Sequence, residues 1–125
     1  MSRVGHSLGG MFPVPHGRLC AILLPAVMRF NGPAVQDRYA LAAASCGLSA
    51  ATERLAVRNL LAEICRLRRE LRLPETLLQA GIEKEMWVEK SSLVIEATLA
   101  DPCCRTNPVP VTSELVADVL KVVAP

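Results

Sequence analysis

The clearest helical pattern in the chain is the stretch from Ala50 to Leu73, which reads AATERLAVRNLLAEICRLRRELRL. Leucine or isoleucine recurs at positions 60, 61, 64, 67 and 71, along one face of a helix. We expect Ser49 to cap the first turn, Glu53 to suit the positive end of the helix dipole, and Pro74 to end the helix. The stretch therefore predicts one long amphipathic helix.

Helical spacing continues on both sides of this stretch. We predict helices at about residues 16–30, 33–46, 83–100 and 112–123, and one helical turn at 75–80 closed by Gly81. Pro25 is expected to bend the first of these helices, and Gly47 to end the second. The expected apolar faces consist of Met86, Leu93, Ala97 and Ala100 in the 83–100 helix, and of Leu115, Val116, Val119, Leu120 and Val123 behind the cap Thr112.

Residues 1–15 contain Gly5, Gly9, Gly10, Pro13 and Pro15, which predict an irregular Gly- and Pro-rich opening segment. No strand-like alternation and no repeat occurs in the sequence. Residues 1–125 are therefore predicted to form a single all-α domain. Five to six helices, within residues 16–125, would pack orthogonally or as a bundle.

Composition excludes several classes of function. A chain of 125 residues buries about two thirds of its unfolded surface, and 51% hydrophobic residues argue against disorder. A net charge of +2 gives no reason to expect a nucleic-acid partner. The arginines of residues 54–72 are interspersed with glutamates, as is typical of a solvent-exposed helix face. The longest apolar run, residues 19–28, is too short for a membrane helix.

The five cysteines are Cys20, Cys46, Cys65, Cys103 and Cys104. Their number is odd and no Cys-x-x-Cys pair occurs, so neither a disulfide framework nor a zinc knuckle is indicated. We expect reduced cysteines and a cytoplasmic location.

Gly5-His6-Ser7-Leu8-Gly9 matches the G-x-S-x-G motif of serine hydrolases. That chemistry needs a strand before the serine and a distant histidine after it. Only six residues precede Ser7, and the only later histidine is His16, nine positions away. We therefore expect Ser7 to lie in a glycine-flanked turn without a catalytic role.

The segment from Gly5 to Asn31, GHSLGGMFPVPHGRLCAILLPAVMRFN, resembles the iron-containing (group III) alcohol dehydrogenases. That family carries a pattern close to H-x-x-x-H-x-L-G-x-x-x-x-x-P-H-G, followed by A-I-L-L-P-x-V-M-x-F-N. Later stretches resemble it too, namely Glu70–Pro74 and Ala97–Pro108 with its Thr106-Asn107-Pro108 triplet. The resemblance covers essentially the whole chain.

The resemblance implies the helical C-terminal domain of a dehydroquinate synthase-like fold, without the N-terminal nucleotide-binding domain. Enzymes of this family interconvert alcohols and aldehydes with NAD(P) and a divalent metal, usually iron, held by one aspartate and three histidines. By this resemblance His16, in Pro-His-Gly, is a metal ligand. His6 lies near cofactor and substrate, with a catalytic role in proton transfer or orientation.

Three positions depart from the family pattern. Ser2 stands where the first histidine of H-x-x-x-H is expected, Cys20 where many members have asparagine, and Val109 where many have arginine. One ligand of four remains in the sequence. We therefore expect Fe²⁺ (or Zn²⁺) and NAD(P) in the parent enzyme, but no tight cofactor binding and no activity of this chain alone.

Two functions remain open. The chain is either the C-terminal part of such a dehydrogenase, acting on a small alcohol or aldehyde, or a non-catalytic helical interaction module or subunit of a split dehydrogenase. Truncation or splitting of a gene would explain Met1-Ser2 at the place of the expected histidine. The expected partners are the missing N-terminal domain or further copies of the chain, because an uncovered apolar surface favours association.

Overall fold

Six α-helices and two short 3-10 helices make up the computed structural model, which describes residues 2–125 except for the side chains of Ser2, Arg3 and Cys103. The elements are α1 (Ser2–Met11), α2 (His16–Asn31), η1 (Gly32–Ala34), α3 (Gln36–Ser45), α4 (Glu53–Glu70), α5 (Lys84–Ala100), η2 (Pro102–Thr106) and α6 (Ser113–Val123). No strand occurs over residues 2–125, so the predicted all-α class is confirmed.

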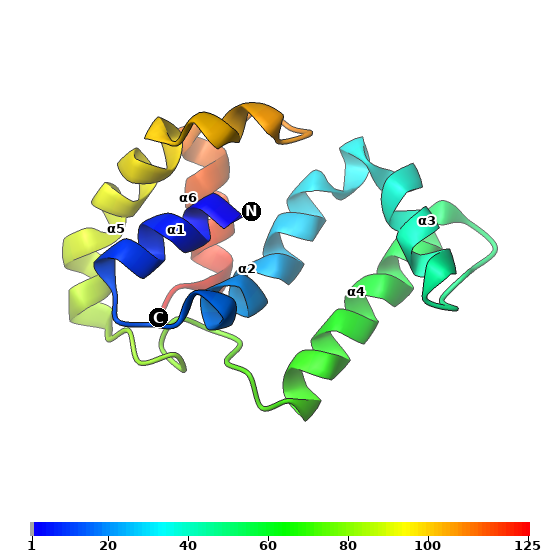
Figure 1. Ribbon diagram of the computed structural model, residues 1–125, viewed down its shortest axis with the longest axis horizontal. Coiled ribbons are helices and arrows are strands. Elements are labelled where there is room, and N and C mark those ends of the chain that lie inside the picture. Colours follow the sequence, from blue (N-terminus) through cyan, green and yellow to red (C-terminus); the bar gives the residue numbers. More distant parts are fainter. Residues whose placement is uncertain (1) are drawn as a thin grey trace.

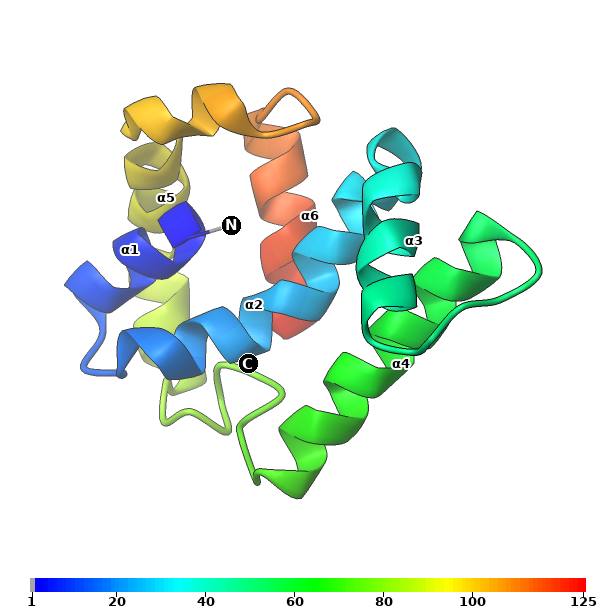
Figure 2. The same cartoon turned by 45° about the vertical axis from the view of Figure 1, so that its right-hand side comes forward.

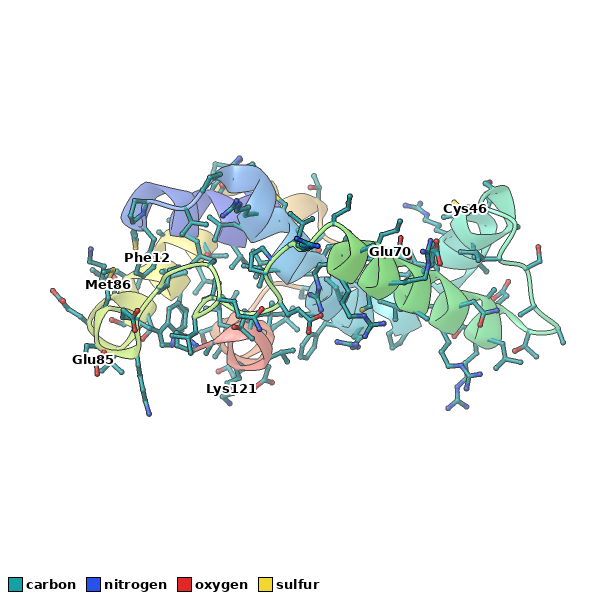
Figure 3. All side chains as sticks on the ribbon, turned by 90° about the horizontal axis from the view of Figure 1, so that it is seen from below. Phe12, Cys46, Glu70, Glu85, Met86 and Lys121 are labelled. Atoms are coloured by element: carbon teal, nitrogen blue, oxygen red, sulfur yellow. The ribbon has the colours of Figure 1, made fainter. Side chains whose placement is uncertain are left out.

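Helix α2 runs through the middle of the molecule and separates two groups of helices (Figures 1 and 2). On one side, α1, α5 and α6 pack with α2 around the hydrophobic core. On the other side, α3 and α4 pack against each other. Seen from below, this pair of helices lies toward the end of the molecule that carries Cys46, and Phe12 and Met86 lie at the other end (Figure 3). The main hydrophobic cluster contains no residue of α3 or α4, whose buried residues are Ala43 and Ala56.

Helix α1 contradicts the prediction of an irregular opening segment, because residues 2–11 are helical. Its glycines Gly5, Gly9 and Gly10 each cost about 1 kcal/mol relative to alanine. Burial of Val4 and Leu8 on one face, and of Phe12 just after the helix, offsets this cost at about 1.5–3 kcal/mol each. The helix therefore forms because of tertiary packing, which a prediction based on the number of glycines does not include.

Helices α5 and α6 differ in how well the sequence predicted their buried faces. In α6, Val116, Val119, Leu120 and Val123 are buried as expected, and the Leu115 amide donates to the Thr112 cap at 3.2 Å. In α5 the expected face is wrong in part, although Met86 packs against the core as expected. Leu93 is 50% exposed, and the buried residues are Val94 and Thr98. Thr98 tolerates burial because its hydroxyl donates to the Val94 carbonyl at 2.7 Å.

Helix α4 begins and ends differently from the prediction. Thr52, not Ser49, caps it, since the Thr52 hydroxyl accepts from the Leu55 amide at 3.2 Å. The helix ends at Glu70, before Pro74, because Arg72 adopts a left-handed conformation with φ 53°. The amide of the next residue then bonds back to the carbonyl of residue 68 at 2.9 Å, as in a Schellman motif.

The arginines of α4 are exposed as predicted except Arg68, whose side chain is 13% exposed. Arg66 forms ion pairs with Glu63, at 2.6 Å, and with Glu70. These pairs lie three and four residues apart on the same face, where oppositely charged side chains meet.

A pair of asparagines ties the last third of the chain to α2. The amides of Asn31 and Asn107 donate to each other's oxygens, each at 3.0 Å, and the Asn107 amide also donates to the Val109 carbonyl at 2.7 Å. Asn31 is buried, so these bonds satisfy a side chain that has little contact with water. The pair thereby holds the Pro-rich connection between α5 and α6 against the end of α2.

Candidate functional site

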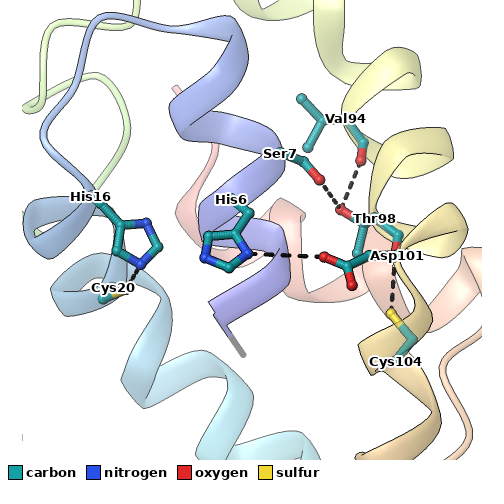
Figure 4. Close-up of polar contacts among 8 residues, drawn as sticks. All are labelled: His6, Ser7, His16, Cys20, Val94, Thr98, Asp101 and Cys104. Carbon is teal, nitrogen blue, oxygen red and sulfur yellow. Dashed lines mark hydrogen bonds and ion pairs between the residues drawn. The ribbon is translucent and has the colours of Figure 1, made fainter.

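The hairpin of α1 and α2 brings the two histidines of the chain together (Figure 4). His6 lies in the middle of α1 and His16 is the first residue of α2. Their rings stack with centroids 5.0 Å apart and an interplanar angle of 26°. Ten residues separate them in sequence, and the short connection at residues 12–15 folds α1 back along α2. The sequence predicted both residues as site residues but could not place them in contact.

His16 is exposed at the start of α2, and its ring points toward the next turn of the helix. Its Nε2 atom lies 3.3 Å from the Sγ atom of Cys20, four residues later and half-buried. Gly5 of α1 faces the same two side chains. A Cβ atom there would lie 3.3 Å from Cε1 of His16 and 3.6 Å from Sγ of Cys20.

His6 lies between His16 and Asp101, and its Nδ1 edge points toward Asp101, which follows the last residue of α5. The Nδ1 atom of His6 lies 3.9 Å from Oδ2 of Asp101, close enough for an electrostatic interaction when the ring is protonated. The His6 side chain is 61% exposed and that of Asp101 is 24% exposed. The His6 imidazole is therefore largely accessible to solvent, with its Nδ1 edge toward Asp101.

Ser7 lies inside a helix, so the predicted glycine-flanked turn is wrong. Its hydroxyl oxygen is 3.2 Å from that of Thr98, and the Thr98 hydroxyl donates to the Val94 carbonyl at 2.7 Å (Figure 4). A nucleophile elbow needs the serine on a sharp turn after a strand. The glycines of the G-x-S-x-G match instead lie on the side of α1 that faces α2, where Gly5 is next to His16 and Gly9 is next to Leu19.

The donor atoms near His16 do not complete an iron site. In the part of the chain that the structure describes, no group of three or more His, Cys, Asp or Glu side chains is arranged to hold a metal ion. The atom next to Nε2 of His16 is a thiol sulfur, whereas Fe²⁺ is better matched by imidazole and carboxylate. The departure noted at Ser2 concerns a side chain outside the described residues.

Comparison with known proteins decides the family. Residues 2–124 match the Fe-containing alcohol dehydrogenase family, C-terminal. The chain belongs to this family. Iron and NAD(P) belong to the family as a whole, as its name and that of an NADPH-dependent relative indicate.

Two curated members of the iron-containing alcohol dehydrogenase family illustrate the match. The chain is 32% identical over 105 residues to the NADPH-dependent butanol dehydrogenase of Clostridium saccharobutylicum, covering 84% of this chain and 27% of that protein. It is 33% identical over 122 residues to the 1-propanol dehydrogenase PduQ of Salmonella typhimurium, covering 94% of this chain and 33% of that protein. The chain thus spans about a third or less of the length of these relatives.

A solved structure of this family has the same fold. A 1,3-propanediol oxidoreductase superposes with a TM-score of 0.83 at 26% identity, covering 95% of this chain and 31% of the other. The helical arrangement is therefore that of the C-terminal part of an iron-containing alcohol dehydrogenase. Over residues 2–125, none of the helices has the length and apolar character needed to cross a bilayer.

Sequence reasoning missed two members of this site. Cys20 was noted only as a departure from the family pattern, and Asp101 only as part of a matching stretch. The spacing of His16 and Cys20, four residues apart at a helix start, was the available signal for their contact. Nothing in the sequence pattern predicted that Asp101 faces His6, because their contact joins segments 95 residues apart.

Proposed function

We propose that this chain supplies the helical part of an NAD(P)-dependent dehydrogenase that interconverts small primary alcohols and aldehydes. The observation that carries the proposal is the family match over residues 2–124 together with the contact of His6 and His16. The substrate class follows from the names of the relatives, which act on butanol and 1-propanol.

In this proposal His6 handles a proton at the substrate. Its Nδ1 lies 3.9 Å from Oδ2 of Asp101, so the carboxylate lies beside this edge of the ring. The Nε2 side can then give a proton to an alkoxide or take one from an alcohol. His16 lies against this ring at 5.0 Å and restricts its rotation.

The proposal also states that the chain alone does not turn over substrate. Its matched length corresponds to 27% and 33% of two relatives, and His16 has one neighbouring donor, Cys20, rather than a full ligand set. Activity would then need a nucleotide-binding polypeptide as partner, with or without self-association of the chain. The free cysteines Cys20, Cys46, Cys65 and Cys104 are compatible with the cytoplasm as the proposed location.

The test is NADH- and NADPH-dependent reduction of butanal and propanal, with Fe²⁺ or Zn²⁺ supplied anaerobically. The purified chain alone is expected to give no turnover, and the chain mixed with the nucleotide-binding half of a relative is expected to give turnover. His6→Gln should lower kcat in the mixture. Turnover by the chain alone that His16→Gln abolishes would overturn the inactivity of the isolated chain. No turnover with any nucleotide-binding half would overturn the dehydrogenase proposal.

A second candidate is a non-catalytic interaction module. The observation that favours it is exposed apolar surface: Leu41 of α3 is 70% exposed, Leu71 after α4 is 67% exposed and Val88 of α5 is 68% exposed. Such side chains favour association with another protein surface. Light scattering distinguishes the two. A stable oligomer that Leu41→Ser dissociates, with no activity in any mixture, favours the module.

A further inference from the structure

We propose that a cavity where α2, α4 and α6 meet binds a phosphate group, as the free ion or as a phosphomonoester, through Arg29, Arg68 and Thr76. The cavity has a volume of about 170 Å³, and residues of these three helices and of the connection between α4 and α5 line it. Helix α2 contacts both α4 and α6 (Figure 2). Neither His6 nor His16 lines the cavity, so its ligand is separate from the proposed dehydrogenase site.

Arg68, in the last turn of α4, is a largely buried cation whose hydrogen bonds are incomplete. Its side chain is 13% exposed, and its buried Nε atom has no hydrogen-bond partner in the part of the chain that the structure describes. A terminal nitrogen lies 3.7 Å from Oε1 of Glu75, which allows electrostatic attraction but is too long for a hydrogen bond. A buried charge is costly unless its hydrogen bonds are made, so this guanidinium can still take an anion as partner.

Two further donors line the same cavity. Arg29 lies in the last turn of α2 and forms no ion pair among the described residues. The Thr76 hydroxyl accepts a hydrogen bond from the Gln79 amide at 3.2 Å, and its own proton remains available to donate. Two arginines against the single carboxylate of Glu75 leave the cavity with a net positive charge.

The walls of the cavity are fixed and largely apolar. Its floor consists of Ile22, Ala26 and Val123, which are buried in the structure. The Leu77 amide donates to the Val123 carbonyl at 2.9 Å, so the segment that carries Thr76 is held against the end of α6. Charged hydrogen bonds are stronger beside such apolar surface than in water.

The number of donors favours phosphate over a carboxylate. A phosphate group has enough oxygen atoms to accept from Arg29, Arg68 and Thr76 together, whereas a carboxylate has two. A water molecule needs about 10–15 Å³ of cavity volume, so about 170 Å³ has room for a phosphate group. The proposal requires the Arg68 guanidinium to turn, so that Nε and a terminal nitrogen donate side by side to two phosphate oxygens.

Titration calorimetry of the purified chain with inorganic phosphate, at constant ionic strength, measures the binding directly. We expect saturable heat with phosphate and none with chloride. In heteronuclear NMR of the unsubstituted chain, the Nε–H signal of Arg68 should shift as phosphate saturates the cavity, because Nε gains an acceptor. The Arg68→Lys variant assigns this signal by its loss. Absence of both the heat and the shift would refute the proposal.

Substitutions then locate the anion. Arg68→Lys keeps the charge but loses the fork of the guanidinium, and should weaken phosphate binding by about 10-fold or more, as for one lost charge-assisted hydrogen bond. Arg29→Gln should have a similar effect. Glu75→Gln should strengthen binding, because it removes the carboxylate that competes for Arg68. A purely structural pair of Arg68 and Glu75 would not give this gain.

The matched control is Arg69→Gln, which removes an exposed arginine of α4 that does not line the cavity and should leave binding unchanged. Circular dichroism verifies that each variant is folded, and the Arg68 signal of the unsubstituted chain decides the case for any variant that is not. Phosphate binding that Arg68→Lys leaves unchanged would place the anion elsewhere and contradict the proposal.

Methyl phosphate distinguishes the two sources of the phosphate group. Equal binding of methyl phosphate and inorganic phosphate indicates an ester whose substituent extends into solvent past Val122, which is 53% exposed. Binding of inorganic phosphate alone indicates the free ion. Acetate should bind about 10-fold or more weakly than phosphate, and acetate binding as tight as that of phosphate would argue against the three-donor site. None of these measurements uses turnover, so their outcome is independent of the proposed dehydrogenase function.

Discussion

Replacing Asn107 by alanine should destabilise the chain through a residue 76 positions away. Asn107 exchanges two hydrogen bonds with Asn31, each at 3.0 Å, and donates a third to the Val109 carbonyl at 2.7 Å. Asn31 is 6% exposed, so water does not replace the lost partner. The asparagines hold the connection before α6 against the end of α2, and the α2–α6 contact contains much of the core.

The magnitude follows from the buried amide left behind. A buried polar group that loses its partner costs about 1–3 kcal/mol, and we expect about 2 kcal/mol for Asn107→Ala. Asn31→Ala should cost a similar amount. Replacing both residues should cost little more than either single change. In the double variant both amides are removed, so no buried amide is left without its partner. The coupling energy of the double-mutant cycle should therefore be about 1–2 kcal/mol.

Urea unfolding followed by circular dichroism measures all four proteins of the cycle. A loss of about 2 kcal/mol shifts the urea midpoint down by about 1 M at an ordinary m-value. Single-variant losses that add within about 0.5 kcal/mol would refute the reasoning, since additivity means that the two amides act independently.

The pKa of Tyr39 gives a second readout. Burial raises this pKa, and the hydrogen bond with Asn31 opposes the rise, so Asn31→Ala should raise the Tyr39 pKa further.

Three further predictions follow from single positions. Arg72→Gly should stabilise the chain by about 1 kcal/mol in urea unfolding, because Arg72 has φ 53° and glycine adopts this conformation without strain; an unchanged or lowered midpoint contradicts this. Leu8→Ala should cost about 2–5 kcal/mol, because Leu8 is 0% exposed, and a smaller loss would mean that α1 is not anchored as described. Backbone hydrogen bonding at Glu114, followed by bonds from Thr112 and Ser113, lowers the pKa of Glu114. The ionised Glu114 side chain therefore stabilises the chain fully above the usual carboxyl pKa, and this stabilisation disappears as the pH falls through the lowered pKa of the folded state. Glu114→Gln should accordingly destabilise the chain at neutral pH and not at acidic pH.

Helices with strong local signals could be predicted from the sequence, and α1 could not. The stretch at 50–73 and the cap Thr112 are local features, and the structure has helices at both. Helix α1 depends on burial of Val4 and Leu8 against other helices, which a local count of glycines does not include. The wrong face of α5 has a similar origin. Its interior includes Thr98, a polar residue that becomes acceptable only because its hydroxyl bonds to the Val94 carbonyl.

The candidate site was predictable in its residues but not in its contacts. The family resemblance pointed to His6 and His16, and the structure places their rings 5.0 Å apart. Their roles in catalysis and metal binding stay predictions. The contact between His6 and Asp101 depends on how α1 packs on α5, which lies beyond any sequence spacing. The neighbour of Nε2 in His16 is Cys20, at a position where the family resemblance led us to expect asparagine.

Position 20 can change the chemistry of the site without changing the fold. Its neighbours Leu19, Ile22 and Leu23 are buried in the core and fix α2 by themselves. Cys20 lies half-buried on the edge of α2 that faces Gly5, where the missing side chain of the glycine leaves space for different donors. Family membership follows from the match over residues 2–124 and does not fix the side chain at position 20. The donor beside Nε2 of His16 is therefore a property of this chain and is not carried over from its relatives.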